Sequence, residues 1–323
     1  MSFQKLPLIY VFHILLACIL LETKFAMADD ADVNLVTVLF CYGPKFSDHA
    51  EYNLSDAASL LKHPKFIHNQ THLYISGYKS FKGHPSTKLM AASYLKRNTT
   101  NFLDLKWEKL VNGDYISSQQ NVLKYSPIVA DFIIELFKLG LPEDSFSMSG
   151  SSMGACAIGV IARDLIERSN GTMQIERISL LDPSNEAAHD EFILPEIEKS
   201  FAKFIDVIHS DAGGIGTTKA IGHANFWLNN GTRFQPECPS DDPKYYKCSH
   251  RKATVIWAES VANGKLKPIL AYPSGSYDEL LKNGAEKYKD LAVAIGIDCP
   301  SSATGNYYLQ HQTTFGNFYA LFK

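Results

Sequence analysis

The chain has 323 residues, 46% of them hydrophobic and 20% charged, with a formal net charge of −3 at pH 7. This composition is that of an ordinary globular protein with enough apolar mass for a large core. The slightly acidic balance, without any basic tract, argues against a nucleic-acid partner.

The first residues carry the pattern of a secretory signal peptide. A lysine precedes the apolar run 6–21, and an A-x-A arrangement ends at Ala28. The alternative is a membrane anchor, but the run is shorter than the roughly 20 residues that a spanning helix needs. We therefore expect a signal peptide over residues 1–28, one domain over residues 29–323, and a secreted protein.

N-glycosylation sequons agree with export. The pattern N-x-S/T occurs at Asn53, Asn69, Asn98, Asn170 and Asn230. A single sequon can arise by chance, whereas five behind a signal peptide predict a glycosylated surface.

Cysteine spacing predicts one disulfide. Five cysteines lie beyond the signal peptide, at Cys41, Cys156, Cys238, Cys248 and Cys299. An odd number leaves at least one thiol unpaired within the chain. Cys238 and Cys248 flank a short polar loop and form the natural bridge in an oxidising compartment. We expect Cys156 to be a buried free thiol, and Cys41 and Cys299 are candidates for a second pair. No spacing resembles a zinc site, so we expect no metal.

Strand and helix patterns alternate along the chain. Short apolar runs predict strands over residues 33–40, 71–77, 101–107, 145–150, 176–182 and 204–210. Longer amphipathic stretches predict helices over 117–140, where Pro127 marks a kink or the true start, and over 153–169. This alternation predicts an α/β fold with a mainly parallel sheet flanked by helices. Active sites of such folds lie beyond the carboxyl ends of the strands.

The segment from Gly150 to Gly154 fits the G-x-S-x-G pattern, centred on Ser152. A predicted strand precedes it and a predicted helix follows, which is the context of a nucleophile elbow in an α/β-hydrolase. The turn is so tight that only small residues fit on either side of the nucleophile. The alternative is a Gly/Ser-rich turn without catalytic function. The strand before the segment and the helix after it favour the elbow, so Ser152 is the candidate nucleophile.

A serine nucleophile needs a histidine base and an acid, which follow it in this fold. Asp182 ends the next predicted strand and is the favoured acid; Asp206 and Asp211 are rivals, although Asp206 lies within a strand pattern. Four histidines follow the serine, at His189, His209, His223 and His250. His250 is favoured, because Cys248 holds its loop and a helix pattern starts at His250. The apolar surroundings of His209 and His223 indicate structural roles.

Five stretches together resemble the pancreatic lipase family over about residues 33–320. They read FSMSGSSMGACAIG, ISLLDPSN, FIDVIHSDAGGIGTTKAIGHANFWLNNGTRFQPEC, CSHRKATVIWAESV and GNYYLQH. The second resembles the family's strand ending in L-D-P, and the fourth resembles the segment with the catalytic histidine. The resemblance implies a Ser152–Asp182–His250 triad that hydrolyses carboxylic esters without metal or organic cofactor.

The resemblance also implies an oxyanion hole. LYISGYKS is similar to the family's loop that contributes one backbone N–H, here that of Tyr78, and Met153 contributes the second. The chain departs from the family at Ser76, Ser151 and Met153, where the family usually has His, His and Leu. None of these is a triad position, so the departures bear on rate and loop rigidity.

Two features bear on substrate. Nine residues, 239–247, lie between Cys238 and Cys248, and so short and polar a lid resembles that of phospholipase A1 members. The residues after His250 leave no room for the β-sandwich domain of the large lipases, so we expect no colipase-type partner. The resemblance implies a glycerolipid substrate at a membrane, micelle or droplet surface. The alternatives are a neutral triacylglycerol lipase and a non-catalytic lipid-binding protein resembling yolk proteins.

Overall fold

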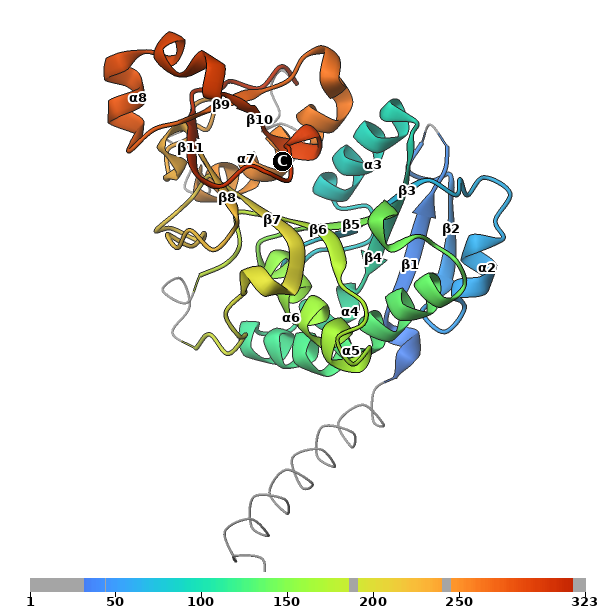
Figure 1. Cartoon of the computed structure of the whole chain (residues 1–323). Coiled ribbons are helices and arrows are strands. Elements are labelled where there is room, and N and C mark those ends of the chain that lie inside the picture. Colours follow the sequence, from blue (N-terminus) through green and yellow to red (C-terminus); the bar gives the residue numbers. More distant parts are fainter. Residues whose placement is uncertain (1–31, 44, 186–190, 240–244, 316–323) are drawn as a thin grey trace, which may run out of the picture.

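The computed structural model describes residues 32–43, 45–185, 191–239 and 245–315, so the expected signal peptide lies outside the described residues. Its strands are β1 (Thr37–Cys41), β2 (His49–Asn53), β3 (Gln70–Ile75), β4 (Thr100–Lys106), β5 (Phe146–Ser151), β6 (Ile175–Leu181), β7 (Ala202–His209), β8 (Ala224–Leu228), β9 (Leu270–Pro273), β10 (Val293–Ala294) and β11 (Gly305–Leu309). Within these ranges they form one 11-stranded sheet in the order β10-β9-β11-β8-β7-β6-β5-β3-β4-β1-β2 (Figure 1).

The sheet is mainly parallel, as the strand–helix alternation predicts. Strands β4, β3, β5, β6, β7, β8 and β11 are paired in parallel. Antiparallel pairs occur only toward the edges among the described strands, where β1 joins β2 and β4, and β9 joins β10 and β11. The architecture is the α/β-hydrolase fold, and it brings the ends of β3, β5, β6 and β7 together at one edge.

Helices cover both faces of the sheet. They are α2 (Ala57–Leu61), α3 (Pro85–Arg97), α4 (Glu108–Val111), α5 (Tyr115–Lys138), α6 (Met153–Arg168), α7 (Tyr245–Asn263) and α8 (Tyr277–Asn283). Helices α5 and α6 lie on one face of the sheet and α3 and α7 on the other (Figure 1). Leu73 and Ile75 pack in one core with α5 and α6, whereas Tyr74 between them packs in the other core with α3 and α7. Side chains of a strand alternate between faces, so burial on both faces explains the continuous apolar runs. In the described part of the chain, no helix is both long and apolar enough to cross a membrane.

Differences from the expected elements are local. Helix α5 begins at Tyr115 and contains Pro127 in its interior, so Pro127 does not mark its start; the apolar face on both sides, including Val122 and Val129, is buried in the core. Helix α7 begins at Tyr245, so His250 lies in its second turn and does not begin the helix. Strand β2 and helix α3 carry mixed polar sequences, and no pattern in the sequence predicted them.

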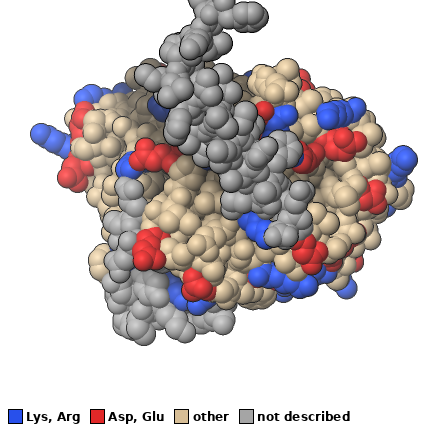
Figure 2. All heavy atoms as spheres, turned by 90° about the horizontal axis from the view of Figure 1, so that it is seen from below, with Lys and Arg blue, Asp and Glu red and all other residues tan. Residues whose placement is uncertain are grey.

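Charges on the face in Figure 2 are mixed in sign. Lys and Arg side chains lie among Asp and Glu on this face and do not gather into one basic surface. This distribution agrees with the small formal net charge of −3.

Candidate active site

Ser152 lies at the turn from β5 to α6, with φ 59° and ψ −128°. A positive φ is uncommon for a residue with a side chain and signals a strained turn. The flanking glycines allow this turn. A Cβ on Gly154 would lie 2.3 Å from the Ile75 carbonyl oxygen, and one on Gly150 would lie 2.5 Å from the Gly154 carbonyl oxygen. The local geometry is therefore that of the elbow which the G-x-S-x-G pattern predicts.

Asp182 follows β6 directly, is fully buried and also has a positive φ, 47°. Its Oδ2 atom accepts a 2.6 Å hydrogen bond from Nδ1 of His250. Its Oδ1 atom accepts the backbone N–H groups of Ser210 at 2.8 Å and Asp211 at 3.0 Å. A carboxylate with three donors is well satisfied despite its burial. The bond to Nδ1 leaves Nε2 of His250 as the basic nitrogen, which is the tautomer a general base requires.

The Ser152 hydroxyl has a different partner from the one expected. Its Oγ atom lies in a 3.1 Å hydrogen bond with Oγ of Ser184. Between Ser152 and His250, both of which the structure describes, no hydrogen bond forms. The structure thus joins the predicted acid to the predicted histidine but leaves the predicted nucleophile bonded elsewhere. In free hydrolases catalytic hydrogen bonds are often long or misaligned and tighten only with substrate, so this geometry is compatible with a triad.

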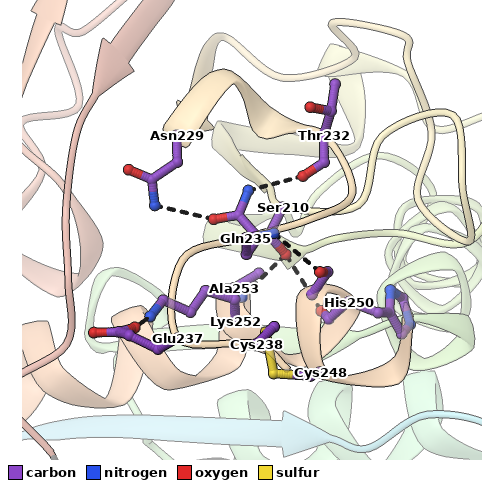
Figure 3. The surroundings of a disulfide bond; sticks show 11 residues. Ser210, Asn229, Thr232, Gln235, Glu237, Cys238, Cys248, His250, Lys252 and Ala253 are labelled. Carbon is purple, nitrogen blue, oxygen red and sulfur yellow. Dashed lines mark hydrogen bonds and ion pairs between the residues drawn. A yellow bond between two sulfur atoms is a disulfide. The ribbon is translucent and has the colours of Figure 1, made fainter. Parts of the chain in front are cut away.

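Ser210 ties the acid to the helix that carries the histidine. Its backbone N–H donates to Asp182. Its hydroxyl donates to the His250 carbonyl oxygen at 3.3 Å and accepts the Ala253 N–H at 3.2 Å (Figure 3). Ser210 is fully buried. One residue therefore fixes helix α7 relative to the carboxylate.

The loop after β3 carries the first predicted oxyanion donor. A Cβ on Gly77 would lie 2.9 Å from the Cβ of Ser152, so this loop packs directly on the elbow. The Tyr78 phenol donates a 2.8 Å hydrogen bond to the Gly113 carbonyl, which holds the loop in place. Among the described residues, the backbone N–H groups of Tyr78 and Met153 have no acceptor. Both are thus available for a developing oxyanion.

The rival acids are engaged elsewhere. Asp206 pairs with Arg177 at 2.9 Å and accepts the Ser179 hydroxyl at 2.6 Å, a local role as expected. Asp211 pairs with Arg233 through bonds of 2.8 and 3.0 Å. One carboxylate oxygen each of Asp182 and Asp211 and one ring nitrogen of His250 lie within 4.8 Å of one another, a spacing at which the three could bind a metal ion. Both carboxylates are already bonded to side-chain donors, so the cluster is a hydrogen-bonded network.

The rival histidines have structural contacts. His209 is buried with its ring stacked on Trp227 at a centroid distance of 3.9 Å, and burial lowers its pKa to about 4. Nδ1 of His223 accepts the Ile205 N–H at 3.0 Å. Both therefore have the structural roles that their apolar surroundings indicated. His189 lies outside the described residues.

The Cys238–Cys248 disulfide is present and confirms the predicted pair (Figure 3). Cys41, Cys156 and Cys299 are free and buried, so pairing of Cys41 with Cys299 was a wrong expectation and the one for Cys156 is confirmed. β1 and the segment before β11, which carry Cys41 and Cys299, are separated in the sheet order. Burial raises the pKa of the Cys156 and Cys299 thiols to about 12, which makes them unreactive.

All five sequon asparagines are exposed, as attachment of a glycan requires: Asn53, Asn69, Asn98, Asn170 and Asn230.

Ser184 and Ser210 were not predicted as site residues, although both stand in stretches that resemble the lipase family. Ser184 follows Asp182 by two positions and Ser210 directly follows the next strand, β7, so their places at the carboxyl ends of the strands are the signal that could have found them.

Comparison with known proteins decides the family. The sequence profile of the Lipase family matches residues 20–314. The chain belongs to the Lipase family. It is 28% identical to rat phospholipase A1 member A over 65% of this chain and 45% of that protein. It is 31% identical to rat lipase member H over 58% of this chain and 40% of that protein. The family resemblance in the sequence is thereby confirmed.

The chain spans about half the length of the curated relatives that it matches. Similar solved structures include a phospholipase/carboxylesterase from Dyadobacter fermentans, 12% identical, covering 58% of this chain and 77% of that chain with a TM-score of 0.32. An α/β-hydrolase from a deep-sea metagenome library is 15% identical and covers 55% of this chain and 66% of that chain, with a TM-score of 0.33.

Proposed function

We propose that this lipase-family chain is a secreted carboxylic-ester hydrolase that acts on glycerolipids as a phospholipase A1. The observation that carries the proposal is the 2.6 Å hydrogen bond from His250 to Asp182, beside a serine on a strained elbow. The three residues lie far apart in the chain, and a purely structural turn would not require this arrangement.

The mechanism follows from these groups. His250, held by Asp182, takes the proton of Ser152 through Nε2 as the Ser152 oxygen attacks the ester carbonyl. The backbone N–H groups of Tyr78 and Met153 donate to the oxyanion. His250 then protonates the leaving alcohol, and water repeats the cycle on the acyl-enzyme with the same base. The Asp182 carboxylate stabilises the imidazolium that forms in both halves.

The length and composition of the segment between Cys238 and Cys248, which resembles the short lid of phospholipase A1 members, support a phospholipid substrate. The segment between Cys238 and Cys248 has nine residues, and α7 already begins at Tyr245 within it. So short a polar segment buries little apolar surface, so we expect weak interfacial gating. Two relatives carry the name phospholipase A1 member A. The partner is then a lipid surface, with neither nucleic acid nor a colipase involved.

Export is supported by three features. The first 28 residues have the signal-peptide pattern. The five sequon asparagines are exposed, and Cys238 and Cys248 form a disulfide of the kind that persists in oxidising compartments. Expression in secretory cells, with N-terminal sequencing of the medium, tests cleavage after Ala28, and glycosidase treatment tests the glycans.

A hydrolysis assay tests the activity. Wild type and Ser152→Ala are compared on phosphatidylcholine, triolein and a short-chain nitrophenyl ester. Release of fatty acid from phosphatidylcholine by wild type alone supports the proposal. Cleavage of triolein without phospholipid cleavage indicates a neutral lipase, and equal inactivity of both proteins on all three substrates indicates a lipid-binding protein.

A further inference from the structure

The Ser152 hydroxyl contacts one residue that the proposed mechanism does not use. Ser184 lies two positions beyond Asp182, is only 6% exposed, and its Oγ atom is 3.1 Å from Oγ of Ser152. Hydroxyl groups both donate and accept, so either serine can be the donor. In both cases the contact fixes where the Ser152 oxygen lies, and there it has no hydrogen bond to His250.

Ser184 is itself held firmly. The backbone around it pairs with the loop after β7: Ser184 forms a β-bridge with Gly216, and the Thr217 N–H donates to the Pro183 carbonyl at 2.9 Å. Behind it, the Cys156 thiol donates to the Ser184 carbonyl at 3.6 Å. The Tyr115 side chain lies near the Ser184 hydroxyl. A hydroxyl on so fixed a backbone stays in place as a hydrogen-bonding partner whenever the Ser152 side chain turns toward it.

We propose that Ser184 holds the Ser152 hydroxyl in a resting orientation, and that Ser152 exchanges this hydrogen bond for one to His250 before it attacks. The inference rests on the proposed function, because it requires Ser152 to be the nucleophile. The free enzyme then divides between a resting and a reactive orientation of one side chain. Ser184 lowers the reactive fraction and with it the rate of the first chemical step.

Removal of the hydroxyl tests this directly. In Ser184→Ala the Ser152 oxygen keeps His250 as its partner, so the reactive fraction rises. Because one neutral hydrogen bond is exchanged, we expect the rate to rise roughly 2- to 10-fold. The opposite expectation follows if Ser184 assists the nucleophile, since its loss then slows the reaction.

The probe is a dialkyl nitrophenyl phosphate. The Ser152 oxygen bonds to phosphorus, the phosphorus–oxygen bond to nitrophenol breaks, nitrophenolate leaves with the electron pair, and the serine proton passes to His250. The second-order rate constant of nitrophenolate release, measured from pH 5 to 9, reports the first step without acyl-enzyme hydrolysis. For Ser184→Ala we expect a higher plateau at high pH. An equal or lower plateau in a folded Ser184→Ala protein overturns the inference.

Two further variants make the result decisive. Ser151→Ala removes a neighbouring elbow hydroxyl that bonds to Tyr74 at 3.0 Å, and it is expected not to accelerate the reaction. Ser184→Cys, a weaker hydrogen-bonding group, replaces Ser184→Ala should thermal unfolding show that the alanine protein is not folded. Equal acceleration in Ser151→Ala also contradicts the inference. A reactive wild type with an unreactive Ser152→Ala upholds Ser152 as the nucleophile that the proposed function requires, whatever Ser184 does, whereas an unreactive wild type contradicts both.

Discussion

Nδ1 of His250 donates a 2.6 Å hydrogen bond to Oδ2 of Asp182, although 68 positions of sequence separate the two residues. The contact forms because Asp182 directly follows β6, Ser210 directly follows β7, and the Ser210 side chain bonds α7 to that edge of the sheet. The orientation of the His250 ring therefore depends on β6, β7 and α7 together. The contributions of Asp182 and Ser210 can be tested separately.

Asp182→Asn is expected to lower kcat by about 10⁴-fold, the effect of the equivalent change in a serine triad. The Ser210 and Asp211 N–H groups require an oxygen at the Oδ1 position. The asparagine NH₂ group must then face His250, which forces the ring proton onto Nε2 and removes the base. Hydrolysis of a nitrophenyl ester measures the loss. The exposed Asp278→Asn is the control, and a loss below tenfold in Asp182→Asn would contradict the assignment of Asp182 as the acid.

Ser210→Ala is expected to reduce kcat several-fold while KM stays unchanged. The variant keeps the backbone donor to Asp182 but loses the side-chain bonds to the His250 carbonyl and the Ala253 N–H. A net contribution of about 1 kcal/mol for each of the two hydrogen bonds sets an upper limit of roughly 30-fold, and a several-fold loss lies within it. Ser210→Thr retains the hydroxyl and should restore the rate. A variant with wild-type kcat, or one that threonine does not rescue, speaks against this role.

The sequence predicted those parts of the site that depend on local rules. Ser152 was found because two glycines and a strand–helix context belong to the elbow itself. Asp182 was found because it ends a buried strand. His250 was favoured over His209 because Cys248 lies beside it and because the surroundings of His209 are apolar, and the family resemblance strengthened that choice. The burial of His209 agrees with it.

Contacts that depend on side-chain orientation could not be predicted. The Ser152–Ser184 bond joins residues that two different strands deliver to one edge, and it depends on a rotamer of Ser152. The sequence also did not predict that Cys41 and Cys299 are both free, because an odd number of cysteines does not say which thiols remain unpaired. For the fold, buried strands were predicted well, whereas the polar strand β2 is stabilised by its pairing with β1 and has no apolar pattern of its own.

Loss of the Cys238–Cys248 bridge is expected to lower the free energy of unfolding by about 2–3 kcal/mol, the chain-entropy value for so short a loop. The double variant Cys238→Ala/Cys248→Ala, compared with wild type in urea, measures the loss. Gln235 donates to the Leu228 carbonyl and to the Thr232 carbonyl, the second of which Figure 3 shows beside the bridge, so the loop should keep its local fold. Cys156→Ala is the control, because it removes a free thiol and keeps the bridge. A reductant should lower its free energy of unfolding by the same amount as it lowers that of wild type. An unchanged midpoint in the double variant would show that the bridge adds no stability.

Stability is expected to fall as the pH drops from about 6.5 toward 4. Burial lowers the pKa of His209 from 6.5 to about 4, and burial with nearby Arg177 lowers that of His72 from 6.5 to about 3. Below pH 6.5 the unfolded chain binds protons at these positions while the folded chain does not, so the unfolded state gains stability. Each histidine contributes a slope of at most roughly 1.4 kcal/mol per pH unit. Urea unfolding at several pH values measures the slope. His209→Asn should reduce the slope by up to the contribution of one histidine. The exposed His68→Gln is the control and should leave the slope unchanged. An equal slope in His209→Asn and wild type would contradict the burial of a neutral ring at 209.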